Sequence, residues 1–246
     1  MEPGFYQTYF TTEKKHWWFK VRRNLIGWLL HQYLPGRPEK TKILDYGCGS
    51  GYLVGQLQKA GYPTYGKDIS PEAIGFGRKQ GINNLSVSRD SQIGFADIFF
   101  DAVLALDVIE HIEDDEFALK EIERVLKPGG IAIITVPAYM WLWGKQDEVS
   151  QHFRRYRLNQ LEKLVRQSTN LIPVKKSYFN TFLFPGIVIT RLLDKIFKIN
   201  RSSDFEINNR FLNRLFYNIF NLEIGWLKRF SFPFGVSILL VLGKYE

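Results

Sequence analysis

Residues 43–53 read ILDYGCGSGYL, a short apolar run that ends in an acid and continues into a turn dense in glycine. Glycine has no Cβ, so Gly47, Gly49 and Gly51 can adopt backbone angles that other residues avoid, and they bring peptide N–H groups close to a ligand at a helix N-terminus. The stretch therefore predicts a strand, a nucleotide-cofactor loop and a helix. The dinucleotide pattern GxGxxG does not fit, because its last glycine would fall on Tyr52 or Val54.

The tighter spacing Asp45-x-Gly47-x-Gly49-x-Gly51 resembles motif I of the class I S-adenosylmethionine (SAM) methyltransferases. In that family the loop accepts the amino-acid tail and sulfonium side of the cofactor. Residues 65–70 (YGKDIS) resemble the end of the family's second strand, where a carboxylate binds the ribose hydroxyls. Residues 87–90 (VSRD) resemble the end of its third strand, where an acid receives the adenine amino group.

Two further segments match the family in the same order. Residues 100–112 (FDAVLALDVIEHI) resemble motif IV, and residues 126–136 (LKPGGIAIITV) resemble the helix stop, the turn and the fifth strand. Five ordered matches are far more specific than a lone glycine loop, so the resemblance implies SAM as the cofactor. It implies cofactor contacts from Asp45, Gly47, Gly49, Gly51, Asp68, Ile69, Asp90 and Asp107.

Strand and helix patterns alternate along the chain, which predicts βαβ crossovers and a parallel sheet. The expected fold is α/β, a Rossmann-like, mostly parallel seven-stranded sheet with helices on both faces, an antiparallel final strand and a helical insertion before the last strand. Strands are expected at 42–46, 63–67, 84–88, 101–106, 130–136, 171–179 and 236–242, and helices at 51–60, 71–80, 114–126 and 158–168.

Three regions are expected: an N-terminal helical lid segment (1–40), a SAM-binding domain (41–179 and 235–246) and a basic, aromatic insertion (180–234). Within the first, residues 14–34 have the apolar spacing of one helix. Its HWWF start at His16, followed by Arg22 and Arg23, resembles a bacterial subgroup found among cell-surface glycan and lipid pathways. The alternative that the tryptophans there are simply core remains open.

The formal net charge of +8 is unevenly placed. Residues 1–140 hold 16 Lys and Arg against 17 Asp and Glu, whereas residues 141–246 hold 17 against 8. The second part therefore favours an acidic partner surface. In the insertion, residues 177–190 are broken by Pro185-Gly186, and residues 191–198 predict a basic amphipathic helix that is too short to span a bilayer. A lid over an apolar substrate, a helix on a membrane interface and a dimer contact all remain open.

The lone Cys48 excludes a disulfide framework and a cysteine metal cluster. Nothing at the N-terminus has the pattern of a signal sequence. The expected location is therefore the cytoplasm, and a peripheral position on the inner face of the membrane remains open. The sequence does not indicate an oligomeric state.

Catalytic candidates are sought among histidines, because methyl transfer to a hydroxyl needs a group that removes a proton. His111 follows Glu110 in the motif IV turn and is either a base or a packing residue. Residues 147–157 follow the fifth strand, and their HFRRY sequence resembles an element of the same bacterial subgroup. There His152 is the preferred base, Arg155 could hold an anionic group and Tyr156 could orient a hydroxyl, the alternative being a solvated basic turn.

A metal site formed by Asp107, Glu110 and His111, at i, i+3 and i+4, is the alternative to an acid-rich cofactor turn. The interpretation adopted has no metal. The predicted function is SAM-dependent methyl transfer to a small-molecule or lipid-linked acceptor, with oxygen favoured.

Two other functions stay open: a non-catalytic SAM-binding or membrane-scaffold protein, and a nucleic-acid methyltransferase. A nucleic-acid partner is not favoured, because the fourth strand lacks a following Asp/Asn-Pro-Pro-Tyr element and the one cysteine lies in the glycine loop.

Overall fold

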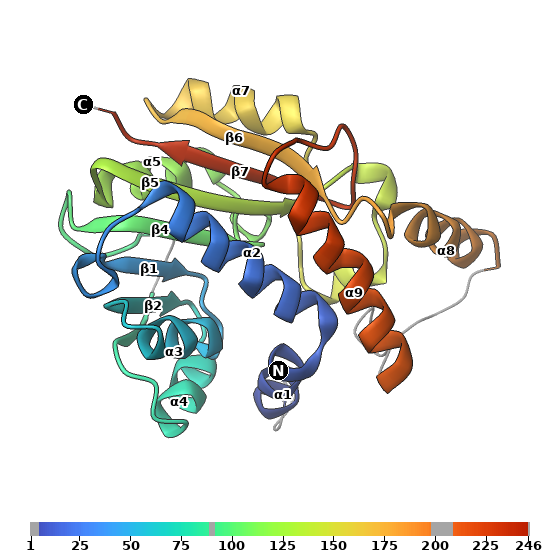
Figure 1. Ribbon diagram of the computed structural model, residues 1–246, viewed down its shortest axis with the longest axis horizontal. Helices are drawn as coiled ribbons and strands as arrows, with labels where there is room; N and C mark the ends of the chain where they lie inside the picture. Colours follow the sequence, from blue (N-terminus) through green and yellow to red (C-terminus); the bar gives the residue numbers. More distant parts are fainter. Residues whose placement is uncertain (1–4, 89–91, 198–208, 246) are drawn as a thin grey trace.

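A computed structural model describes residues 5–88, 92–197 and 209–245. Its core is a seven-stranded sheet in the order β3-β2-β1-β4-β5-β7-β6 (Figure 1). The strands are β1 (Ile43–Tyr46), β2 (Thr64–Asp68), β3 (Leu85–Val87), β4 (Phe100–Leu106), β5 (Leu126–Pro137), β6 (Ile172–Phe179) and β7 (Ser237–Gly243).

The sheet is mixed, as predicted. Strands β1 to β5 pair in parallel, whereas β7 runs antiparallel to both β5 and β6. All four residues of β1 and nearly all of β4 are buried, because strands covered on both faces are apolar throughout. The carboxyl ends of β1, β2 and β4 therefore meet at one edge of the sheet, where a ligand-binding crevice is expected in such folds.

Helices cover the sheet and extend from one end of it (Figure 1). They are α1 (Phe5–Lys15), α2 (Trp17–Tyr33), α3 (Tyr52–Lys59), α4 (Pro71–Lys79), α5 (Asp115–Val125), α6 (Lys145–Val149), α7 (Leu158–Ser168), α8 (Phe184–Phe197) and α9 (Arg210–Leu227). Short 3-10 turns lie at Pro38–Lys40, Ile109–His111 and Met140–Leu142.

The helix predicted at residues 14–34 is α2, and a separate helix, α1, precedes it. The chain breaks at His16, whose ring accepts a hydrogen bond from the Trp18 N–H and so caps the start of α2. Trp17 is buried, and Trp18 stacks on Phe179 and Phe220. Both tryptophans therefore belong to the core, which was the alternative left open above.

The insertion also differs from its prediction. Helix α8 begins at Phe184 and includes Pro185 and Gly186 in its first turn, where proline's missing N–H costs no helical hydrogen bond. No residue of α8 is buried, and the helix projects away from the rest of the molecule (Figure 1). Helix α9, by contrast, packs along α2, with Phe220 against Trp17 and Trp18. Within the described residues, no helix combines the length and apolarity that crossing a membrane requires.

Candidate functional site

The glycine loop leaves no room for side chains at two of its positions. A Cβ on Gly47 would lie 2.4 Å from Cγ2 of Val108, and a Cβ on Gly51 would lie 2.8 Å from Cδ2 of Leu85. Both glycines have positive φ, 75° and 74° respectively. The loop thus needs glycine for its conformation and for its close approach to the turn that follows β4 and to the start of β3.

Asp68, at the end of β2, organises this loop. Its Oδ2 accepts a hydrogen bond from the Gly49 N–H at 2.7 Å, and its Oδ1 accepts one from the Ser70 N–H at 2.9 Å. Asp45 is buried, and burial raises its pKa to about 8 although the positive charge of Arg22 lowers it. Ile69 beside them is 73% exposed, so its side chain is free to cover a ligand.

Asp90, the acid expected near adenine, lies outside the described residues.

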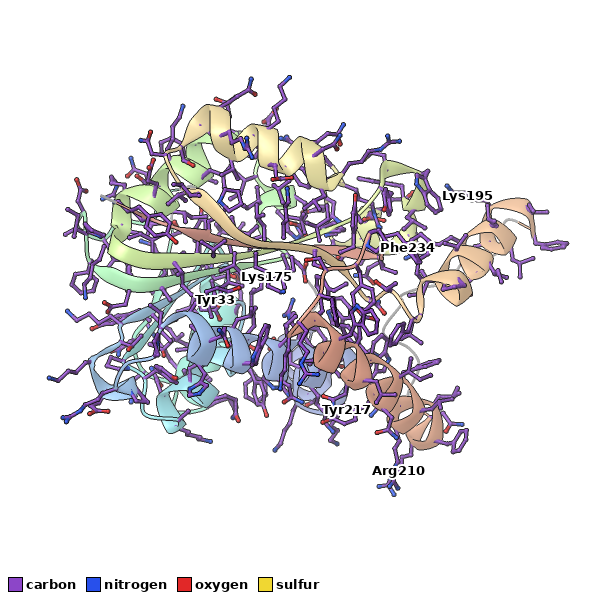
Figure 2. The ribbon with its side chains drawn as sticks, turned by 45° about the horizontal axis from the view of Figure 1, so that its top comes forward. Tyr33, Lys175, Lys195, Arg210, Tyr217 and Phe234 are labelled. Carbon is purple, nitrogen blue, oxygen red and sulfur yellow. The ribbon has the colours of Figure 1, made fainter. Side chains whose placement is uncertain are left out.

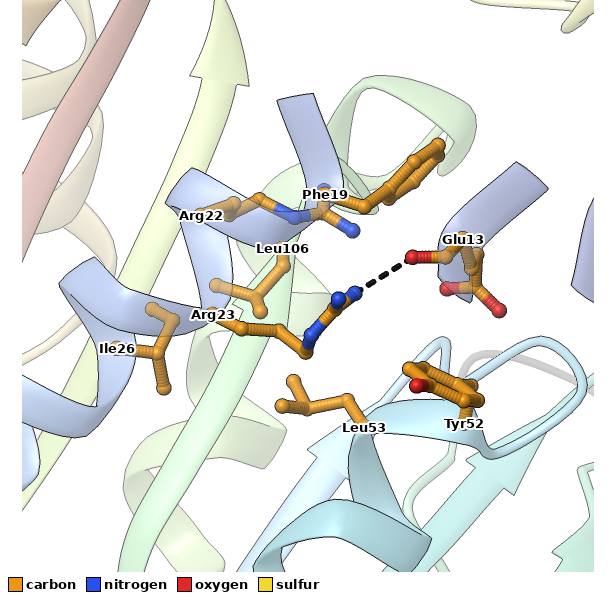
Figure 3. A pocket seen from close by; sticks show the side chains of 8 residues that line it. All are labelled: Glu13, Phe19, Arg22, Arg23, Ile26, Tyr52, Leu53 and Leu106. Atoms are coloured by element: carbon orange, nitrogen blue, oxygen red, sulfur yellow. Dashed lines mark hydrogen bonds between the residues drawn. The ribbon is translucent and has the colours of Figure 1, made fainter. Parts of the chain in front are cut away.

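Helices α1 and α2 close over the loop. The pocket that they form with α3 and the end of β4 is lined by Glu13, Phe19, Arg22, Arg23, Ile26, Tyr52, Leu53 and Leu106 (Figure 3). Glu13 is buried and accepts a hydrogen bond from Ser50 Oγ at 3.2 Å. Burial raises the Glu13 pKa to about 7, although Arg22 and the Ser50 hydrogen bond act in the other direction. Sequence reasoning missed Glu13, because nothing local marks it as buried.

Asp107 lies at the end of β4 and has two partners in the chain. Its Oδ2 is 2.5 Å from Arg22 Nη1, and its Oδ1 accepts a hydrogen bond from Thr135 Oγ1 at 3.0 Å. These contacts connect α2 and β5 to the motif IV turn. Arg22 is 85 residues away in sequence, so no local pattern could have paired it with Asp107.

A second cluster lies just beyond β5. Asp147, fully buried on α6, holds His152 and Arg155: its Oδ1 is 2.9 Å from His152 Nδ1, and its two oxygens accept from Arg155 Nε at 2.7 Å and Nη2 at 2.9 Å. Burial opposes ionisation of Asp147, but these hydrogen bonds outweigh it and hold the pKa of the carboxyl well below its usual range. An ionised carboxylate only accepts hydrogen bonds, so the proton of a neutral His152 lies on Nδ1 and leaves Nε2 as the free acceptor.

Arg155 therefore does not hold an anionic ligand, contrary to the interpretation of it as an anion clamp. It is buried, with two hydrogen bonds to Asp147 and one to the carbonyl of Ala138. Tyr156 is buried too, and its hydroxyl donates to Asp115 Oδ2 at 2.8 Å. Burial and that hydrogen bond raise the Tyr156 pKa, so the phenol stays protonated.

His152 meets the motif IV turn. Its ring lies edge-on to His111, with 4.5 Å between the ring centres. Burial lowers the His111 pKa to about 4, so this imidazole is neutral near pH 7. Glu110 is fully buried, neither carboxylate oxygen has a partner among the described residues, and burial raises its pKa well above the usual value.

The metal-site alternative takes a different form in the structure. Glu110, His111 and His152 each offer a ligand atom within 4.8 Å of the others, a spacing that could accommodate a metal ion. Asp107, which the sequence placed with Glu110 and His111, instead turns to Arg22 and Thr135.

These residues fit SAM. The glycine turn packs its backbone directly against Val108 and Leu85, and Asp68 sits at the end of β2. Helix α3 starts at Tyr52 directly after the loop, with N–H groups that lack helical acceptors. The acid that follows β4 and the histidines beyond it lie at the same carboxyl edge of the sheet. Fold and site together define a class I SAM-dependent methyltransferase.

Comparison with known proteins supports the same class of enzyme. Residues 44–134 match the family model described as a methyltransferase domain. The ubiquinone biosynthesis O-methyltransferase of Rhizobium rhizogenes is 27% identical over 180 residues, which cover 69% of this chain and 71% of that protein. A SAM-dependent methyltransferase from Archaeoglobus fulgidus has the same fold, with a TM-score of 0.57, 19% identity and coverage of 95% and 98% of the two chains.

The fold is also that of Haemonchus contortus phosphoethanolamine N-methyltransferase 2, whose structure is a complex with SAM. The TM-score is 0.58 at 18% identity, and the match covers 88% of this chain and 51% of that one. The present chain thus contains a methyltransferase domain at residues 44–134 and has the fold of class I SAM-dependent methyltransferases, which supports SAM as its cofactor.

Proposed function

We propose that the protein transfers the methyl group of SAM to a hydroxyl of a small acceptor with a lipid-like apolar part, and that His152 removes the hydroxyl proton. The observation that carries this proposal is the Asp147–His152 pair beside the motif IV turn. Oxygen is favoured as the acceptor atom because relatives named as ubiquinone biosynthesis O-methyltransferases match about seven tenths of the chain.

SAM, when bound, supplies a methyl group on an electrophilic sulfonium. The chain must align the acceptor hydroxyl with that methyl group and take up one proton as the oxygen attacks. His152 suits the second task, since Asp147 orients its ring and leaves Nε2 free. As His152 becomes positively charged, the adjacent ionised Asp147 stabilises that charge. His111 is then a packing neighbour that remains neutral.

The proposal also assigns the residues that bind SAM. Asp68 binds the ribose hydroxyls, Asp90 the adenine, and the glycine loop the amino-acid tail of SAM. Residues 1–40 act as a lid over the cofactor, which is consistent with Glu13 of α1 reaching Ser50 in the loop.

Replacement of His152 by glutamine is expected to lower kcat by about 100-fold or more, because a positioned general base contributes roughly 10²–10⁴ to a rate. Affinity for S-adenosylhomocysteine should not change. The measurement is formation of S-adenosylhomocysteine with a panel of phenolic and lipid-linked acceptors. His31→Gln, an exposed histidine near the end of α2, is the control and should behave like the wild type. Unchanged turnover in His152→Gln would remove the base from the proposal.

The lipid-like part of the acceptor is supported by the exposed face of α8. Ile189, Leu192, Leu193 and Ile196 recur at helical spacing and are all exposed, while Arg191 and Lys195 lie on the same helix. An apolar stripe with nearby cations is the pattern of a helix that lies on a membrane interface. We therefore assign the insertion to contact with the inner face of a membrane, where a lipid-linked acceptor would be met.

The double variant Leu192→Glu/Ile196→Glu is expected to reduce co-flotation with vesicles at least tenfold, because burial of a large aliphatic side chain contributes about 1.5–3 kcal/mol. Leu192→Ser/Ile196→Ser should show a similar loss, since it removes the apolar surface without adding charge. The charge-matched control is Gln160→Glu/Gln167→Glu on exposed positions of α7. Equal flotation of all four proteins would contradict the membrane assignment.

A further inference from the structure

A cavity of about 430 Å³ lies between α2 and α9 and shares Arg23 with the pocket of Figure 3. Its lining combines four cations with three uncharged polar side chains and includes no carboxylate; the residues are Lys20, Arg23, Asn24, Arg210, Asn213, Arg214 and Tyr217. Figure 2 shows Tyr217 between the two helices and Arg210 at the outer end of α9. The size is within the range of small-molecule sites, roughly 300–1,000 Å³, but the lining is far more polar than usual.

The charges of this cavity are not balanced within the described part of the chain. None of the four cations forms an ion pair with a described carboxylate. Arg23 donates to the backbone carbonyl of Glu13, which leaves Lys20, Arg210 and Arg214 as the cations available to a ligand. A concave surface lined by one sign of charge concentrates field and attracts ions of the opposite sign. Arg210 also begins α9, so the positive end of the helix dipole adds to that field.

The walls of the cavity are held in place by hydrogen bonds. Asn213 accepts from the Trp17 N–H at 2.8 Å and donates to the Lys15 carbonyl at 3.1 Å, which fixes α9 to the junction of α1 and α2. Asn24 donates to Tyr217 Oη and to Asn221 Oδ1, both at 3.2 Å. The cations therefore project from two helices whose spacing is set without them.

The outer face of α9 continues from this cavity. Arg210, Arg214 and Tyr217 recur at i, i+4 and i+7 and face α2, whereas Phe211 and Leu215 follow each arginine by one residue and are exposed. A ligand with an anionic head and an apolar body would match both surfaces at once. Guanidinium groups in particular suit phosphate, which they can bind through paired hydrogen bonds.

We propose that the cavity between α2 and α9 is a binding site for a phosphate group, with Lys20, Arg210 and Arg214 as its charged ligands. The phosphate belongs to a phospholipid headgroup or to a soluble phosphorylated molecule, and the apolar side chains beside the cavity favour the headgroup. The site is distinct from the methyl-transfer site and does not depend on the proposed acceptor.

The test uses the full-length protein and two kinds of probe. Inorganic pyrophosphate is titrated calorimetrically, and flotation is measured with vesicles of phosphatidylcholine alone or mixed with phosphatidic acid. The cavity variant is Arg210→Gln/Arg214→Gln. Its control, Lys163→Gln/Arg166→Gln on α7, removes the same charge elsewhere. Affinity for S-adenosylhomocysteine and the thermal unfolding temperature are measured for each protein to verify the fold.

The cavity variant is expected to bind phosphate probes at least tenfold more weakly per lost cation, and the control should match the wild type. Loss of pyrophosphate binding in the cavity variant identifies a soluble ligand. Loss restricted to vesicles with phosphatidic acid identifies a headgroup, and flotation on phosphatidylcholine alone, which reports α8, should persist. An equal decrease in the control would show diffuse charge attraction and overturn the proposal, as would absence of binding to either probe. Retained S-adenosylhomocysteine binding separates each result from failure of the methyl-transfer site.

Discussion

Asp68→Ala is expected to weaken S-adenosylhomocysteine binding by more than 100-fold. Asp68 accepts two backbone hydrogen bonds, from Gly49 and Ser70, and the first of these sets the position of the glycine loop. These bonds exist in the free protein, so their loss acts on affinity only by displacing the loop. A hydrogen bond to a charged group contributes about 1.5–3 kcal/mol, so two carboxylate bonds to the ribose hydroxyls would amount to roughly 3 kcal/mol or more, which exceeds a factor of 100. In the proposed site the same carboxylate binds the ribose, and the variant loses that contact as well. The measurement is calorimetric titration of the purified protein.

Asp101→Ala is the control for this experiment. Asp101 lies in the same sheet but at the opposite end of β4, where it bonds to Lys127 and to the Lys42 N–H. It should lose some stability and keep its affinity for S-adenosylhomocysteine. Asp68→Asn adds a finer comparison, because an amide oxygen accepts more weakly and carries no charge. Wild-type affinity in Asp68→Ala would contradict the assignment of this edge of the sheet as the cofactor site.

Asp147→Ala is expected to destabilise the fold by about 3–5 kcal/mol, because it leaves the charge of Arg155 buried without a partner. The side chain of Arg155 is 7% exposed and that of Asp147 is fully buried, so water cannot replace the lost carboxylate. For a chain of this size each kcal/mol corresponds to roughly 2–4 °C in Tm. The decrease should be visible in thermal unfolding. Turnover should fall too, since His152 loses the group that orients its ring.

Asp97→Ala provides a matched comparison, because Asp97 also pairs with an arginine but is 69% exposed. Its loss should change stability by at most about 1 kcal/mol, as is usual for surface pairs. The stability loss in Asp147→Asn should lie between those of Asp147→Ala and Asp97→Ala, because asparagine keeps one oxygen as a hydrogen-bond acceptor. A stability loss in Asp147→Ala no larger than that in Asp97→Ala would show that the buried cluster contributes little.

Local patterns in the sequence were sufficient for the sheet and the cofactor loop. Apolar runs such as residues 101–106 predict buried strands, and the spacing of Gly47, Gly49 and Gly51 predicts the turn, because both properties depend on residues close in the chain. The helix break at His16 and the start of α8 at Phe184 were missed. In both places capping chemistry or a first-turn proline outweighs apolar periodicity.

Roles that depend on burial were predicted less well. Arg155 was interpreted as a ligand clamp because an arginine in the HFRRY element can bind an anionic group through paired hydrogen bonds, yet it lies in the interior and holds Asp147. The segment that contains both residues was found from the sequence, but which of its side chains face inward depends on α6 and on the strand end that packs over it. The same holds for the contacts among Glu13, Arg22 and Asp107, because these residues approach one another only after α1 and α2 fold over the sheet.

The sequence alone determined the class of fold and the position of the glycine loop, because these follow from hydrophobic periodicity and from glycine at fixed spacing. The cofactor was implied by the resemblance of five ordered segments to the SAM methyltransferases. Tertiary structure decided which polar groups are paired and which remain available. It buried Asp147 with Arg155 and left one ring nitrogen of His152 without a partner among the described residues. It also brought Lys20 into one basic cavity with Arg210 and Arg214, which lie 190 residues or more further along the chain. Charge and hydrogen bonding act through space, so contacts of this kind have no signature along the chain.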